Sequence, residues 1–197
     1  MMRLKIVQAG EPILRRQASV ISPEELRSAE IQQLIAWMRE TMRDAPGVGL
    51  AAPQVGVSIQ LAVIEDRAEL QGLIAPEKLV ERGRRPVPFH VIVNPRMELD
   101  GPPAEFFEGC LSVAGFSAIV PRALRAHVEC LNERGEPVSI HAEGWYARIL
   151  QHEIDHLHGK LYLDHMHSRS FLTVENLNRH WSELPIAEVK ERPGIGG

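Results

Sequence analysis

The sequence predicts one α+β domain in which antiparallel strands surround a helix in the C-terminal half of the chain. Short runs of alternating apolar and polar residues are separated by Gly, Pro and Asn, which is typical of strands and turns. Consecutive runs lack the intervening helices that parallel pairing requires, so we expect antiparallel sheets. Residues 144–157 repeat apolar side chains at helical spacing and carry the pattern His-Glu-x-x-His.

Length and composition bound the class of protein. The chain has 197 residues, of which 44% are hydrophobic and 24% charged, as in ordinary globular domains with a sizeable core. The net charge of −4 argues against a general nucleic-acid binder. No apolar run reaches the ~18 residues of a membrane span, and the N-terminus lacks a secretory signal. Two cysteines are too few for a disulfide framework, so we expect a reducing compartment.

The first long element predicted is a helix over residues 22–45. Ser22 can cap it, Pro23 suits the first turn, and Glu25 completes a capping box. Pro46 and Gly47 end it. Its apolar residues recur at helical spacing and predict a buried stripe: Ile31, Leu34, Ile35, Met38 and Met42.

Strand-like segments follow this helix. Residues 57–65 alternate like a strand, whereas residues 66–90 predict a long irregular loop insertion. We expect three arginines of this loop to be solvated: Arg82, Arg84 and Arg85. Four further runs predict strands: 89–99, 117–122, 124–132 and 136–143. Gly144 then opens the C-terminal helix, and the chain after His167 predicts a wrap with little core, ending in an extended tail over about 182–197.

The C-terminal helix carries a metal-binding pattern. The spacing of His152 and His156 places both imidazoles on one helix face, together with Trp145 and Ile149. Glu153 beside the first histidine can act as a built-in base. The other apolar stripe predicts that much of the helix is embedded: Ala147, Leu150, Ile154 and Leu157. A catalytic site of this type usually has three protein ligands, so one more is required.

Cys110 is the strongest candidate for that third ligand. It lies in "FFEGCLSV" after Gly109, where the backbone can approach another element closely. A thiolate binds borderline divalent metals well, and one Cys with two His is a known catalytic ligand set. The rival interpretation of Cys110 is a small buried hydrophobe, as we interpret Cys130. Glu175 on a following helix is the alternative ligand.

A glycine-rich segment, "GVGLAAPQVG" at 47–56, fits a dinucleotide-binding fingerprint only superficially. That fingerprint follows a strand and opens a helix, whereas here a helix precedes it and a strand follows. We interpret Gly47 and Gly49 as holding the backbone open for a ligand. Gln54 offers an amide that can donate and accept hydrogen bonds.

Taken together, the three segments resemble peptide deformylases. The family motifs G-x-G-L-A-A-x-Q, E-G-C-L-S and H-E-x-D-H appear here in order as "GVGLAAPQ", "EGCLS" and "HEIDH". The similarity extends over most of the chain and is greatest to the plant and animal organellar branch, which bacteria can also carry. The resemblance implies a single catalytic domain over residues 1–197.

The resemblance also implies a mechanism. Cys110, His152 and His156 would bind one divalent metal with water in the fourth position, and hydroxide formed there would attack. The ion is typically Fe²⁺, and Zn²⁺, Ni²⁺ or Co²⁺ can substitute. Glu153 would be general base and acid, and the amide of Gln54 with the backbone N–H of Leu111 would stabilise the reacting oxygen.

The implied substrate is the N-formyl-methionyl end of newly made polypeptides at the ribosome, with formate as product and no specificity for nucleic acid or membrane. We expect the bacterial cytoplasm or, for a mature form, a mitochondrial or plastid matrix. Gly49 and Gly109 could let the substrate backbone pair with the protein. The candidates for the apolar wall around the methionine side chain are Val48, Trp145 and Ile149. The rival interpretation of each is ordinary core packing.

Two other functions fit the same residues. A zinc endopeptidase would use His152, His156 and Glu175 as ligands. A metal-stabilised binding module for formylated chains would add a further ligand, such as His158, to Cys110 and the two histidines and close the coordination shell.

Overall fold

The structure is a computed structural model that describes residues 3–72, 74–192 and 195. The helices are α1 (Pro23–Leu26), α2 (Ala29–Asp44), α3 (Ala68–Gln71), α4 (Pro76–Glu81), α5 (Trp145–Leu157), α6 (Val174–His180) and α7 (Ile186–Glu191). The strands are β1 (Gly49–Ala51), β2 (Leu61–Asp66), β3 (Val87–Cys110), β4 (Val113–Leu131), β5 (Pro137–Glu143) and β6 (Leu172–Thr173). This mixture of helices and sheet in one domain confirms the predicted α+β class.

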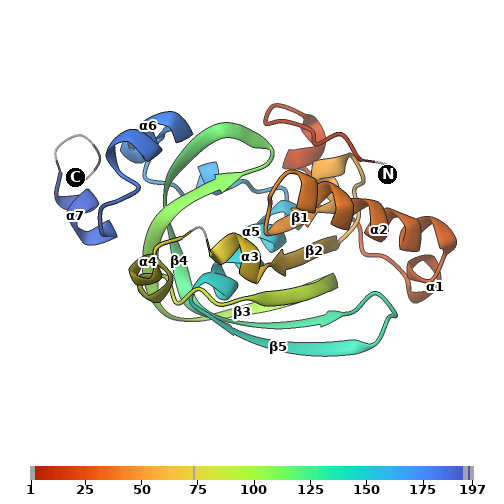
Figure 1. Cartoon of the computed structure of the whole chain (residues 1–197). Coiled ribbons are helices and arrows are strands. Elements are labelled where there is room, and N and C mark those ends of the chain that lie inside the picture. Colours follow the sequence, from red (N-terminus) through yellow and green to blue (C-terminus); the bar gives the residue numbers. More distant parts are fainter. Residues whose placement is uncertain (1–2, 73, 193–194, 196–197) are drawn as a thin grey trace.

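All neighbouring strands pair antiparallel, in the order β1-β2-β3-β4-β5, with β6 added to β4. The runs predicted as separate short strands join into the long curved hairpin of β3 and β4 (Figure 1). Register shifts beside Pro95 and between Asp100 and Pro103 accommodate the turn-like residues without ending β3. The hairpin closes after Cys110, which therefore stands at the end of a strand.

The predicted helix over 22–45 is divided into α1 and α2. The capping box is present: Ser22 Oγ accepts from Glu25 N at 3.2 Å, and Glu25 Oε2 accepts from Ser22 N at 2.8 Å. The helix is interrupted after Leu26, with Arg27 as the C-cap of α1. Ser28 then caps α2 by accepting a hydrogen bond from Ile31 N at 3.3 Å. Four members of the predicted stripe are buried: Leu34, Ile35, Met38 and Met42.

The segment 66–90 is more ordered than predicted, because it contains α3, α4 and the start of β3. The expectation that Arg84 is solvated is wrong. Its guanidinium donates to both carboxylate oxygens of Asp66 at 2.7 and 2.9 Å, and the two side chains are 10% and 0% exposed. A buried carboxylate requires such a partner, which a composition-based loop prediction does not reveal.

Helix α5 lies inside the fold, where it contacts β1, β2, β4 and β5 (Figure 1). Its second apolar stripe is buried as predicted: Ala147, Leu150, Ile154 and Leu157. Helices α6 and α7 follow α5, so the chain after His167 contains more regular structure than the wrap with little core that we predicted. β6 pairs with β4, and α7 buries Val189. The tail predicted over 182–197 includes α7, while 193–194 and 196–197 lie outside the described residues.

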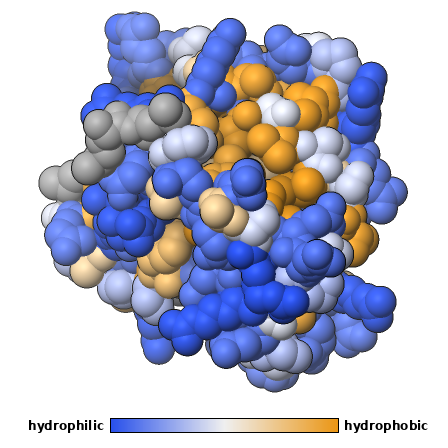
Figure 2. Space-filling view, turned by 90° about the vertical axis from the view of Figure 1, so that its right-hand side faces the viewer, coloured by the Kyte–Doolittle hydropathy of each residue, from blue (hydrophilic) through white to orange (hydrophobic). Residues whose placement is uncertain are grey.

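Helices α1 and α2 lie at one end of the molecule, and α6 and α7 at the other (Figure 1). Seen from the α1–α2 end, one apolar area is surrounded by hydrophilic side chains (Figure 2). None of the helices in the described residues combines the length and apolar character that a membrane span requires.

Candidate metal centre

The structure brings three predicted ligands together from two distant parts of the chain. Cys110 Sγ at the end of β3 lies 3.3 Å from His156 Nε2 on α5, and His156 Nε2 lies 3.2 Å from His152 Nε2. The three ligand atoms lie within 4.8 Å of one another. By contrast, the side chain of Glu175 is 77% exposed and pairs with Arg179.

These residues fit a divalent ion. Both imidazoles direct Nε2 towards the same point, where the sulfur also lies, and one sulfur with two nitrogens suits a borderline divalent metal. The opposite nitrogen of His152, Nδ1, contacts the Glu108 carboxylate, as is usual for a metal-binding histidine. The corresponding Nδ1 of His156 is buried and has no partner among the described residues.

Glu108 anchors a buried charge network behind His152. Its carboxylate accepts from Arg122 at 2.9 Å and from Arg148 at 2.9 Å, and Arg122 also donates to Asp155 at 2.5 Å. Burial alone would raise the pKa of Glu108, but His152 and Arg122 outweigh it and lower that pKa. Burial would lower the pKa of His152, but hydrogen bonds with Cys110 and Glu108 hold it well above its usual value. The network therefore fixes the ring that presents Nε2.

Glu153 lies beside this centre in an enclosed position. It is 4% exposed, and its Oε2 has no hydrogen-bond partner among the described residues. A Cβ added at Gly49 of β1 would lie 2.2 Å from Glu153 Oε1, so only glycine leaves room for this carboxylate. Burial raises the pKa of Glu153 to about 7. A carboxyl group with that pKa can gain and lose a proton near neutral pH.

Gln54 is held so that its amide nitrogen faces Cys110. Its Oε1 accepts from Ala51 N at 2.8 Å, while Nε2 lies 3.2 Å from Ser112 Oγ and 3.5 Å from Cys110 Sγ. The backbone N–H of Leu111, in the β3–β4 turn, has no partner in the part of the chain that the structure describes. Two donors thus lie near the sulfur: the Gln54 amide, which faces it, and the Leu111 N–H.

A cavity of about 510 Å³ opens onto these groups. Its lining includes nearly all of the predicted site residues, namely Val48, Gly49, Gln54, Gly109, Cys110, Leu111, Trp145, Ile149, His152 and Glu153. His156 is 1% exposed and lies outside this lining. Polar groups therefore gather at one part of the cavity, and apolar side chains supply other parts of its wall.

Sequence reasoning missed the residues that support the centre: Glu108, Ser112, Arg122, Arg148 and Asp155. One signal for Glu108 was present, because side chains alternate along a strand and Glu108 therefore shares a face with Cys110. The arginines carried no comparable signal. Arg148 lies on α5 four residues before His152, but its 3% exposure follows from the tertiary fold.

Comparison with known proteins relates the chain to one family. The model for "Polypeptide deformylase" matches residues 3–171. A chloroplastic peptide deformylase 1A of Solanum lycopersicum is 46% identical over 96% of this chain and 67% of its own length. The mitochondrial peptide deformylase of Homo sapiens is 41% identical over 86% of this chain and 70% of its own length.

A solved structure agrees. A class I type b peptide deformylase from Acinetobacter baumannii, bound to Met-Ala-Ser, has a TM-score of 0.74 and 34% identity, covering 84% of this chain and 99% of its own. The resemblance that three short motifs suggested is thereby confirmed. This chain belongs to the polypeptide deformylase family.

Proposed function

We propose that this chain removes the N-formyl group from the formyl-methionine terminus of newly made polypeptides and releases formate. The observation that carries the proposal is the convergence of Cys110 Sγ and two imidazole Nε2 atoms within 4.8 Å, beside the buried carboxylate of Glu153. The names of the relatives support the same reaction, since plant, human and bacterial relatives are all called peptide deformylases.

The positions of the polar residues support the following proposed roles. Cys110, His152 and His156 would hold a divalent ion, which supplies Lewis-acid activation of water and of the formyl oxygen. Glu153 accepts the proton that the attacking water loses and delivers it to the amide nitrogen as the C–N bond breaks. The formyl carbon gains the oxygen of water, so the products are formate and a free amino terminus.

The negative charge that develops on the formyl oxygen needs donors that are already in place. Gln54 Nε2 and Leu111 N–H provide them, and the bonds of Gln54 to Ala51 and Ser112 keep its amide oriented. Removing one such donor typically costs about 10²–10³-fold in rate. Val48, Ile149 and Trp145 would surround the methionine side chain, while Gly49 and Gly109 would let the peptide backbone approach.

We infer Fe²⁺ as the resident ion from the family resemblance, with Zn²⁺, Ni²⁺ or Co²⁺ as possible substitutes, because first-row divalent ions compete for one ligand set. The proposed site of action is nascent chains at the ribosome, in the bacterial cytoplasm or, for a mature form, in an organellar matrix. The curated relatives include chloroplastic, mitochondrial and bacterial proteins.

A formate-release assay with formyl-Met-Ala-Ser tests the proposal. Wild-type protein, purified without oxygen, should release formate, and Glu153→Ala should retain metal yet lose hydrolysis. Gln54→Ala should lose kcat by about 10²–10³-fold while keeping metal. The matched control is Gln17→Ala, since Gln17 is exposed. Full activity of the Glu153→Ala variant would contradict the assigned base.

The same preparation separates the rival functions. A zinc endopeptidase would cleave an unformylated peptide internally, and a binding module would release no formate from any peptide. Internal cleavage without formate release would refute deformylation.

A further inference from the structure

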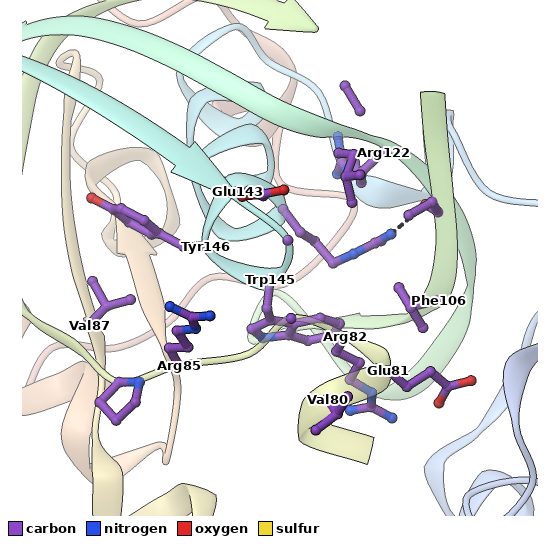
Figure 3. Close-up of a pocket in the computed structure, with 17 residues that line it drawn as sticks. Val80, Glu81, Arg82, Arg85, Val87, Phe106, Arg122, Glu143, Trp145 and Tyr146 are labelled. Carbon is purple, nitrogen blue, oxygen red and sulfur yellow. Dashed lines mark hydrogen bonds between the residues drawn. The ribbon is translucent and has the colours of Figure 1, made fainter. Parts of the chain in front are cut away.

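A second cavity, of about 560 Å³, is lined in part by Trp145, which also lines the catalytic cavity (Figure 3). It is enclosed by the end of α4, the start of β3, the middle of the β3–β4 hairpin and the first turn of α5. Trp145 and Arg148 line both cavities, so the indole forms a shared wall. The catalytic mechanism makes no use of this second space.

Arg82 brings a partly buried charge to this cavity, and among the described residues it forms no ion pair. Its guanidinium stacks on the Trp145 ring at 5.1 Å, and its Nε is buried without a hydrogen-bond partner among the described residues. Burial, and then the neighbouring charge of Arg84, lower the pKa of Arg82, and the charge of Glu81 offsets only part of this lowering. A partly buried cation of this kind calls for a counter-ion, because buried charges are normally paired.

A second buried donor points to the same requirement. Trp145 Nε1 is buried and, within the residues that the structure describes, has no acceptor. Buried N–H groups are rarely left unpaired, and an unassigned ion or water is a usual explanation. Gly144 provides no side-chain cap for the thirteen-residue helix α5, whose N-terminus carries a partial positive charge and adjoins the cavity.

The carboxylates that line the cavity do not satisfy these donors. Glu81 Oε1 accepts from Ile186 N at 2.9 Å, and Glu81 Oε2 lies 4.0 Å from Lys78 Nζ. Glu143 and Arg82 lie on opposite sides of the Trp145 ring in Figure 3. Arg85, which also has no ion pair among the described residues, lines the cavity apart from Arg82 and adds positive charge.

We propose that this cavity binds the phosphate group of a small molecule, held chiefly by the Arg82 guanidinium and the Trp145 indole N–H. The charge of Arg82, the more distant charge of Arg85 and the partial charge of the helix N-terminus together make the cavity positive, which favours a dianion over a singly charged carboxylate. The volume leaves room for more than the phosphate group itself. Because Trp145 also lines the catalytic cavity, an occupied site holds one wall of the proposed methionine pocket in place; this consequence rests on the proposed function.

Titration of the ¹⁵N-labelled, zinc-loaded protein with inorganic phosphate tests the proposal. Each of the three tryptophans gives one indole N–H signal, and Trp145→Phe assigns the relevant one. We expect a saturable shift of the Trp145 signal, compared with sodium chloride at equal ionic strength. Arg82→Gln should weaken this response by about 10- to 100-fold, because a charge-assisted hydrogen bond is lost. The matched control Arg16→Gln changes an exposed arginine beside Gly159, beyond the other end of α5, and should respond as wild type.

Several outcomes would overturn the phosphate site. If phosphate does not shift the Trp145 indole signal of the wild-type protein, the proposal is refuted. This result needs no variant, so the test stands even if Arg82→Gln fails to fold. An undiminished response in folded Arg82→Gln would place the ion elsewhere, including at the metal centre. A response to formate with none to phosphate would refute the phosphate assignment. None of these results depends on deformylation, which the formate-release assay tests separately.

Discussion

Gly49→Ala is expected to disable the enzyme by displacing its base. The added Cβ would lie 2.2 Å from Glu153 Oε1, 2.5 Å from Cδ and 2.7 Å from Cγ. Contacts of a Cβ below 3.0 Å are essentially absent from proteins, so the carboxylate must retreat by about 0.8 Å or β1 must move. Strand β1 is held by pairing of Gly49 with Ile64, and therefore we expect Glu153 to yield. A misplacement of about 1 Å costs on the order of 10²-fold in rate.

The assay is kcat for formate release from formyl-Met-Ala-Ser, with metal content and thermal unfolding measured on the same sample. We expect kcat to fall about 10²-fold while metal content stays unchanged, because the altered contact involves none of the three ligands. The control is Gly72→Ala, where the added Cβ would meet its nearest neighbour, Glu69 O, at an ordinary 3.5 Å. Wild-type kcat in folded Gly49→Ala would refute the placement of Glu153.

Three further substitutions probe the charges and ligands around the centre. Glu108→Gln should weaken metal affinity by about 10- to 100-fold, measured by competition titration with a chelator. The control Glu98→Gln changes an exposed glutamate and should leave the affinity unchanged. Equal metal affinities of Glu108→Gln and the wild type would contradict the anchoring role of Glu108. Cys110→Ala should lose metal on desalting where buried Cys130→Ala retains it; metal retained by the first would remove sulfur from the ligand set. In metal-free protein the pKa of Glu153 is raised to about 7. Between pH 4.5 and about 7 the folded state therefore binds more protons than the unfolded state. The stability that this group contributes declines as pH rises through that range. Glu153→Gln should therefore become progressively more stable relative to wild type over that range, by up to about 3 kcal/mol in urea unfolding, and a pH-independent difference would argue against a buried, proton-sharing Glu153.

Local sequence patterns were sufficient for much of the fold and for the residues that meet at the centre. Three features depend only on neighbours within a few residues: the alternation of apolar and polar side chains in the strands, the capping box at Ser22, and the second apolar stripe of α5. The three motifs are equally local. They identified Cys110 although it lies more than forty residues before His152 along the chain, because the resemblance supplied the long-range relation that spacing does not.

The features that the sequence did not reveal depend on tertiary contacts. The division of the first helix follows from Ser28 acting as a second cap, and Ser28 offers no stronger local signal than other polar residues there. Arg84 looked like one of several loop arginines until the fold placed it on buried Asp66. Likewise, Glu108 became part of the site because two separate elements, β4 with Arg122 and α5 with Arg148 and His152, deliver these side chains to one carboxylate.

The central claim is that one sulfur and two imidazoles share a divalent ion beside Glu153. X-ray absorption at the metal edge of anaerobically purified protein tests it most directly. We predict one sulfur neighbour at about 2.3 Å together with two imidazole nitrogens at about 2.0–2.1 Å, if zinc is loaded. A first shell of oxygen and nitrogen atoms with no sulfur would contradict the account.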